Sequence, residues 1–202
     1  MICRKSDFDS IEKVVSAIKN GEVVIIPTDT VYGFSGIADS VHDCDKKIRK
    51  IKGRAESKPF IQLISSPEKI FDYTDEKIPE RLLKFWPGPL TIIVKDKRFS
   101  KAPDAIKNDD AAENICVKTA FRCPGDEWLR KILAQIDSPV YSTSLNRSGQ
   151  PVLDEETAIL NEFSSDASVI VLDGDKKNAV PSTIVEFAGE EIKVLRQGSV
   201  KI

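Results

Sequence analysis

The feature that most constrains the fold is a short apolar run over residues 23–26 (VVII), in which apolar and polar residues do not alternate. Strands of this kind occur where both faces of a sheet are covered, as in α/β proteins. Directly before it, residues 8–20 carry apolar side chains at helical spacing, and Asn20-Gly21 is a suitable helix end. A covered strand that follows an amphipathic helix predicts a layered α/β fold.

The rest of the sequence continues to mix helical and extended patterns. Further helices are predicted over residues 41–52, 67–71, 79–86, 126–136 and 155–163, and further strands over residues 60–64, 90–94, 115–118, 140–143 and 169–172. A hairpin of strands at 182–187 and 192–195 turns at Gly189. Residues 96–112 are polar and aperiodic, which predicts a mobile loop. Since no repeat interrupts the pattern, we predict a single domain over residues 1–202, an open twisted mixed sheet with flanking helices.

Composition narrows the classes of function. The formal net charge of −2 argues against a protein whose main task is to coat nucleic acid, although it is compatible with a local basic patch. One histidine, His42, and four cysteines without Cys-x-x-Cys spacing provide no zinc-type ligand set, so we predict no protein-bound metal. We expect free thiols and a cytoplasmic protein without membrane contact, because the N-terminus has no apolar signal core and no apolar stretch approaches roughly 20 residues.

Two polar clusters, far apart in the sequence, suggest a phosphate site. Residues 142–149 (STSLNRSG) place hydroxyls, an amide and a glycine at the end of a predicted strand. Lys52 and Arg54 lie at the end of a predicted helix, and Lys58 adds a third cation. Such a group suits a triphosphate, although the dipole at a helix C-terminus also favours cations for structural reasons alone. Ligands bind beyond the strand ends of α/β sheets, so we predict that both clusters line one concave, positively charged cavity.

Other polar residues stand at further strand ends, where an ordinary structural role is an open alternative. Thr30 follows the first strand, Lys118 closes the strand at 115–118, Ser182 opens the hairpin and Arg196 ends it. The sequence contains no P-loop or Rossmann glycine motif and no Ser-His-Asp arrangement. These absences argue against the common nucleotide-binding folds and against a triad hydrolase.

Six motifs, taken in order, resemble those of one known family. They are PTDTVYGF at 27–34, KGR with KP at 52–59, WPGPLT at 86–91, STSLNRSG at 142–149, PST at 181–183 and LR at 195–196. The chain closely resembles the short, single-domain form of the YrdC family, the L-threonylcarbamoyladenylate synthases. The resemblance implies an open α/β fold with a cationic cavity.

The resemblance also implies an activity and its site residues. L-threonine, bicarbonate and ATP would condense to threonylcarbamoyl-AMP and pyrophosphate, for the threonylcarbamoyladenosine modification of tRNA. Mg²⁺ would enter with ATP, held mostly by phosphate oxygens and water. The partners would be the tRNA threonylcarbamoyl-transfer machinery, with direct tRNA binding as an open option. ATP would contact Lys52, Arg54, Lys58, Ser144, Asn146 and Arg196, and threonine would contact Thr30, Lys118, Ser142 and Ser182.

Three positions depart from the family pattern. Lys118 stands where members often have an arginine, and lysine lacks the bidentate fork for a carboxylate. Leu63 stands where longer relatives have a histidine, and Leu145 where a small residue is usual. Asn146 favours the synthases over a neighbouring branch that lacks it. The alternative function is an RNA-binding or regulatory module without synthase activity, which the slightly acidic composition and 7% aromatic content disfavour.

Overall fold

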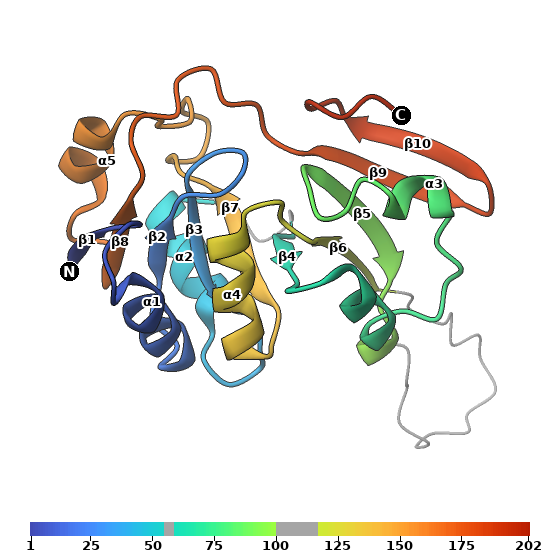
Figure 1. Ribbon diagram of the computed structural model, residues 1–202, viewed down its shortest axis with the longest axis horizontal. Helices are drawn as coiled ribbons and strands as arrows, with labels where there is room; N and C mark the ends of the chain where they lie inside the picture. Colours follow the sequence, from blue (N-terminus) through green and yellow to red (C-terminus); the bar gives the residue numbers. More distant parts are fainter. Residues whose placement is uncertain (55–58, 100–116) are drawn as a thin grey trace.

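The computed structural model describes residues 1–54, 59–99 and 117–202. Within these ranges the strands form one mixed sheet of ten strands, in the order β1-β8-β2-β3-β7-β4-β6-β5-β9-β10, with β1 and β10 at opposite edges (Figure 1). The open α/β fold with flanking helices is therefore confirmed. The strands are β1 Ile2–Arg4, β2 Val24–Ile26, β3 Gly33–Ile37, β4 Ile61–Leu63, β5 Leu90–Lys95, β6 Lys118–Arg122, β7 Val140–Ser144, β8 Val169–Leu172, β9 Thr183–Ala188 and β10 Glu191–Arg196.

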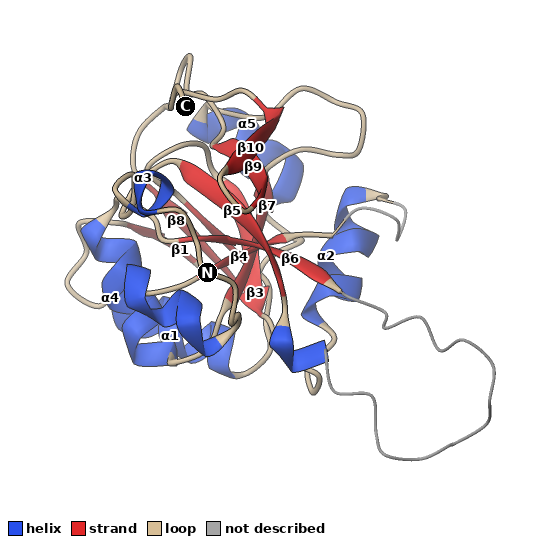
Figure 2. Cartoon of the chain, turned by 90° about the vertical axis from the view of Figure 1, so that its right-hand side faces the viewer, coloured by secondary structure: helices blue, strands red, loops and turns tan. Residues whose placement is uncertain are grey.

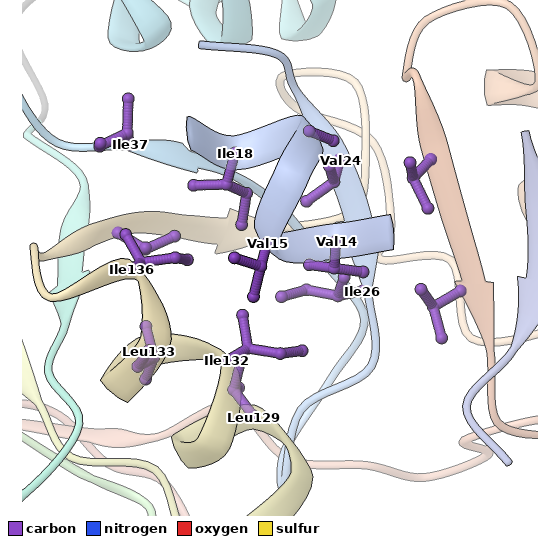
Figure 3. Packing of buried hydrophobic residues seen from close by; sticks show 14 of the residues in the cluster. Val14, Val15, Ile18, Val24, Ile26, Ile37, Leu129, Ile132, Leu133 and Ile136 are labelled. Carbon is purple, nitrogen blue, oxygen red and sulfur yellow. The ribbon is translucent and has the colours of Figure 1, made fainter. Parts of the chain in front are cut away.

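Helices lie on both sides of the sheet (Figure 2). Around β2 they cover both faces, as the apolar run at residues 23–26 predicts. On one face, α1 (Ser10–Lys19) and α4 (Glu127–Ile136) pack against alternate side chains of β2, Val24 and Ile26 (Figure 3). On the other face, α2 (Cys44–Lys52) and α5 (Glu156–Phe163) contribute to a core around Ile25. Each residue of β2 therefore faces a core, which explains why its sequence does not alternate.

A third core lies under the other half of the sheet. The 3₁₀ helix η1 (Pro67–Asp72) and the single-turn helix α3 (Glu80–Leu83) place Ile70 and Leu82 against Leu90 of β5 and Phe121 of β6. The two predicted helices in this region are thus shorter or more tightly wound than expected. A second 3₁₀ helix, η2 (Lys97–Phe99), occupies part of the predicted loop at 96–112, whose residues 100–112 lie outside the described ranges.

The structure contains two strands that the sequence pattern did not predict. β1 is a three-residue strand at the edge of the sheet. β3 pairs antiparallel with both β2 and β7, and its sequence, GFSGI, contains two glycines, which weaken strand propensity. Close packing accounts for the two glycines. A Cβ on Gly33 would lie 2.8 Å from the carbonyl oxygen of Thr143, and one on Gly36 would lie 3.0 Å from Cβ of Cys44.

The strand predicted at residues 115–118 is placed incorrectly. β6 runs from Lys118 to Arg122, between β4 and β5, while residues 115 and 116 lie outside the described ranges. The arginine that ends this strand concealed it, since a charged side chain is normally a sign of solvent. Along the described part of the chain, none of the helices has the length and apolar character needed to cross a bilayer.

Candidate functional site

A cavity of about 170 Å³ opens where β2, β6 and β7 end and β9 begins. Its wall is formed by segments that are far apart in the sequence. Six of the ten residues predicted for substrate binding line it, namely Thr30, Arg54, Ser142, Ser144, Ser182 and Arg196. The two polar clusters identified in the sequence therefore do meet, with Arg54 from one and Ser142 and Ser144 from the other.

Three guanidinium groups face this cavity, those of Arg54, Arg122 and Arg196. Arg54 lies with its guanidinium carbon 4.9 Å from the ring centroid of Phe60, and its Nη1 donates to Oγ1 of Thr143 at 3.3 Å. Burial, with the nearby charge of Arg49, lowers the pKa of Arg54. The described residues that line the cavity include no acidic side chain, so the wall carries an excess of positive charge.

Arg122 is the most deeply buried of the three, with 5% of its surface exposed. Its Nη1 donates to Oγ1 of Thr30 at 2.9 Å and its Nε to the carbonyl oxygen of Gly88 at 3.2 Å. Nη2 forms an ion pair with Asp29, whose second carboxylate oxygen accepts from the backbone N–H of Gly125 at 2.9 Å. Asp29 therefore fixes the direction of the Arg122 side chain toward the cavity.

Hydroxyl groups complete the wall. Oγ1 of Thr28 lies 2.9 Å from Oγ1 of Thr30, and the hydroxyl of Ser182 lies 2.8 Å from that of Thr91. Arg196 at the end of β10 donates from Nε and Nη2 to the carbonyl oxygen of Ser182 at 3.0 and 2.8 Å. These contacts hold both cationic and hydroxyl groups in defined positions before any ligand binds.

Lys52 and Asn146, both predicted to contact ATP, lie next to the cavity and not on its lining. Lys52 is only 3% exposed. Its Nζ donates to the carbonyl oxygens of Ser144 and Asn146 at 2.5 and 2.8 Å and to Oδ1 of Asn146 at 2.9 Å. Burial, assisted by the charge of Arg54, lowers the pKa of Lys52 to about 8. Lys58 lies outside the described residues.

Lys118, which the resemblance places among the threonine contacts, does not line the cavity. Lys118 begins β6, four residues before Arg122, and its side chain is half exposed and forms an ion pair with Glu186 of β9. Arg122 lines the cavity instead, and sequence analysis did not select it because the strand was placed too early. A signal was present in the sequence, since Arg122 follows the apolar pair Ala120-Phe121 and precedes Cys123-Pro124.

The other two departures from the family pattern lie in the cores. Leu63 is 1% exposed and packs with the residues under α1 and α4, and Leu145 is fully buried in the core around Ile25. A large apolar side chain at position 145 therefore fills the core and leaves the cavity open. Asp29, a further residue of the site that sequence analysis did not select, stands behind Arg122.

The donor set near the cavity indicates how Mg²⁺ would be held. Among the described residues, no group of three or more histidine, cysteine, aspartate or glutamate side chains is arranged to bind a metal ion. The carboxylate of Asp29, which stands behind Arg122, already accepts from Arg122 and Gly125. These residues suit an ion that arrives on the phosphates of a nucleotide, and Mg²⁺ accompanying ATP stays a prediction.

Comparisons with known proteins agree with this architecture. The family model described as telomere recombination (Sua5/YciO/YrdC) matches residues 16–198. Over 193 residues the chain is 30% identical to threonylcarbamoyl-AMP synthase of Bacillus subtilis, covering 94% of this chain and 54% of the relative. Over 196 residues it is 30% identical to the protein of that name from Vibrio parahaemolyticus, covering 94% of this chain and 100% of the relative.

A solved structure shares the fold as well. Pyrococcus abyssi Sua5 complexed with L-threonine superposes with a TM-score of 0.78 at 25% identity, over 98% of this chain and 57% of the other. The chain thus spans about half the length of the Bacillus and Pyrococcus relatives. The family match over most of the sequence confirms the resemblance found in its motifs, and the chain belongs to the Sua5/YciO/YrdC family.

Proposed function

We propose that the protein is an L-threonylcarbamoyl-AMP synthase, which condenses L-threonine, bicarbonate and ATP and releases pyrophosphate. The observation that carries this proposal is the convergence of three arginines and several hydroxyls in one cavity. Relatives named threonylcarbamoyl-AMP synthase and the complex of a Sua5 protein with L-threonine support it. Guanidinium groups on a wall whose described lining has no acidic side chain suit a polyanion, and the hydroxyls suit a small polar substrate.

Threonine would bind at the inner end of the cavity. The Arg122 guanidinium, fixed by Asp29, offers the fork geometry that a carboxylate accepts in bidentate fashion. Thr30, Ser142 and Ser182 surround it with hydroxyl groups for the amine and hydroxyl of the substrate. In this proposal Arg122 takes the role that the sequence prediction assigned to Lys118.

The triphosphate would lie toward Arg54 and Arg196, with Ser144 beside it. Lys58, which lies outside the described residues, stays a predicted contact. Mg²⁺ bound to the phosphates would neutralise part of the charge that develops on the departing pyrophosphate. The protein contributes position and positive potential, which account for most of the rate enhancement in enzymatic transfers at phosphorus.

The reaction needs no covalent intermediate with the protein. The threonine amine forms a C–N bond with the carbon of bicarbonate, and water leaves, which gives a carbamate. A carbamate oxygen then attacks the α-phosphorus of ATP, and the bond from this phosphorus to pyrophosphate breaks. The cavity holds the two reactants in line and stabilises charge on the leaving group.

We place this activity in the cytoplasm, with the tRNA threonylcarbamoyl-transfer machinery as the consumer of the adenylate. Three of the four cysteines, Cys3, Cys44 and Cys123, are described, and they are free and buried, which suits a reducing compartment. A mixed anhydride is useful only where an acceptor is available, and in this proposal the tRNA-modifying machinery supplies it.

The experiment that tests this function is incubation with ATP, L-threonine and labelled bicarbonate, followed by detection of a labelled adenylate and of pyrophosphate. Both should form only when all three substrates are present. Arg54→Ala should abolish pyrophosphate release while circular dichroism shows an intact fold, because it removes a cation from the cavity wall. Salt-dependent tRNA binding by the wild-type protein without any adenylate would support an RNA-binding module and overturn the proposal.

A further inference from the structure

We propose that Lys52 is a positioning residue, which holds the segment of Ser144 and Asn146 against the cavity, and that it does not itself bind phosphate. The proposal rests on the function proposed above. The family resemblance places this lysine among the ATP contacts, and its charge alone would suit that role. The structure points to a different use of its three protons.

All the hydrogen-bonding capacity of the ammonium group is already in use. A lysine ammonium has three donors, and Nζ of Lys52 has three oxygen acceptors within 2.9 Å, two on Asn146 and one on Ser144. Its side chain is almost completely buried. Turning it toward a phosphate would take this donor away from the carbonyl oxygens of Ser144 and Asn146, which is unfavourable for polar groups that stay buried.

The surrounding backbone shows that this corner is built as one unit. The carbonyl oxygen of Lys52 accepts from the N–H of Ser148 at 2.7 Å, and that of Ile51 accepts from Nη1 of Arg147. Carbonyl groups at the end of a helix have no partner within the helix. Residues 147 and 148 therefore donate hydrogen bonds to the last carbonyl groups of α2, while the ammonium group of Lys52 donates to the oxygens of residues 144 and 146.

The link to the cavity runs through Asn146. Its Oδ1 accepts both from Nζ of Lys52 at 2.9 Å and from the hydroxyl of Ser144 at 2.8 Å. Its amide nitrogen donates to the carbonyl oxygens of Arg147 and Gln150, which fixes the orientation of the side chain. Lys52 thus sets the position of the Ser144 hydroxyl, which lines the cavity, without lining the cavity itself.

A double-mutant cycle distinguishes positioning from direct binding. ATP affinity, measured by calorimetry, and kcat/KM for ATP are compared among the wild type, Lys52→Met, Asn146→Ala and the double variant. Each single change should lower both quantities by roughly 10-fold, and the double variant should lose no more than about threefold beyond the weaker single variant, because both changes disrupt the same contact. Losses that multiply in the double variant would overturn the proposal.

The salt dependence of ATP binding supplies an independent measurement. An arginine that contacts phosphate makes binding weaken as salt rises, so Arg54→Ala should flatten that dependence. Lys52→Met should leave it as steep as in the wild type, since the ammonium is buried and in this proposal makes no contact with phosphate, and salt screens buried charges much less than exposed ones. If Lys52→Met flattens the dependence as Arg54→Ala does, Lys52 contacts phosphate and the proposal is wrong.

Two further variants control for folding and for charge. Lys50→Met removes an exposed lysine of the same helix and should change neither ATP affinity nor kcat/KM for ATP. If Lys52→Met is too unstable to purify, Asn146→Ala alone carries the test: unchanged ATP affinity in that variant would overturn the proposal. ATP binding by a wild-type protein that forms no labelled adenylate would refute the synthase function and still allow this test.

Discussion

Arg122 is the residue whose placement most depends on the structure around it. A buried guanidinium loses its hydration, which is costly unless hydrogen bonds replace it. Thr30, the carbonyl of Gly88 and the carboxylate of Asp29 supply those bonds. Together they hold a planar fork at the cavity wall, directed at the proposed position of the threonine carboxylate.

Exchange of Arg122 for lysine keeps the charge and removes the fork. In the proposed synthase, Arg122→Lys should raise KM for threonine by roughly 10- to 100-fold, the loss expected for a hydrogen bond to a charged group. Steady-state pyrophosphate release at saturating ATP measures it. Lys118→Met is the matched control, because Lys118 is exposed and pairs with Glu186, and its KM should match the wild type. A raised KM for threonine in Lys118→Met, with an unchanged KM in Arg122→Lys, would show that Lys118 contacts threonine, as predicted from the sequence.

Cys123 affects stability at alkaline pH. Burial raises the pKa of its thiol to about 12 from an ordinary value of 9.0. Below pH 9 the thiol is protonated in the folded and the unfolded chain alike, so its contribution to stability is complete. Between pH 9 and about 12 the thiol of the unfolded chain loses its proton while that of the folded chain keeps it. Over this range the thiol lowers the free energy of unfolding by about 1.4 kcal/mol per pH unit. Cys123→Ala should remove that slope.

Urea unfolding of the wild type and of Cys123→Ala between pH 8 and about 10.5 measures this effect. The loss of a buried sulfur lowers stability by a similar amount at every pH, so the slope against pH is the informative quantity. Parallel curves for the two proteins would show that the thiol does not titrate as its burial indicates.

At the scale of elements, the sequence predicted those parts whose stability is local. The apolar runs of β2, β5, β7 and β8 and the amphipathic patterns of α1 and α4 were predicted because burial produces them directly. β3 could not be predicted this way, since its glycines are required by the close approach of β7 and of Cys44, which no local pattern reveals.

In the candidate site, too, the sequence predicted some residues and could not predict the orientation of others. Hydroxyls near the end of a strand, such as Ser142 and Ser144 of β7, were predicted because ligands of α/β sheets bind at strand ends. Lys52 and Arg54 stand two residues apart, yet one turns into the protein and the other faces the cavity. That difference depends on oxygens more than ninety residues away along the chain, so the sequence around these residues could not reveal it.

The C-terminal segment after β10 is an element whose position depends on one glycine. A Cβ on Gly198 would lie 2.3 Å from the carbonyl oxygen of Pro181 and 2.4 Å from the backbone nitrogen of Thr183. The N–H of Gly198 also donates to Oγ1 of Thr183 at 2.9 Å, and that hydroxyl donates to the carbonyl of Val200 at 2.8 Å. This packing places the segment directly beside Ser182 and Arg196 of the cavity.

Gly198→Ala should therefore displace the segment and disturb both cavity residues. We expect kcat/KM for ATP to fall at least tenfold, with a loss of stability of about 1–3 kcal/mol, typical of overpacking against a backbone. Ser199→Ala, at the exposed neighbouring position, is the control and should behave as the wild type. Full activity in Gly198→Ala would show that the segment does not position Arg196.

At the scale of the whole molecule, the cavity crosses the junction between two halves of the sheet. Strands β4 and β7 join the halves through three residue pairs. Thr30 and Ser142 belong to the half that contains β2, β3 and β7, whereas Arg122, Ser182 and Arg196 belong to the half that contains β5, β6 and β9. A ligand that contacts both sets must link the two halves, which also share packing through Leu63 of β4 in the core under α1 and α4.

Substrate binding should therefore stabilise the whole sheet. With ATP and threonine present at about 100 times their dissociation constants, each ligand adds about 2.7 kcal/mol to the free energy of unfolding, because both bind the folded state alone. Thermal unfolding should shift upward, and amide hydrogen exchange should slow in β7 and in β6, on opposite sides of the junction. In Arg122→Lys, threonine should protect neither strand, while ATP should still raise the unfolding temperature. Protection confined to one of the two strands in the wild type would show that the ligands contact only one half, and that the cavity does not act as a single site.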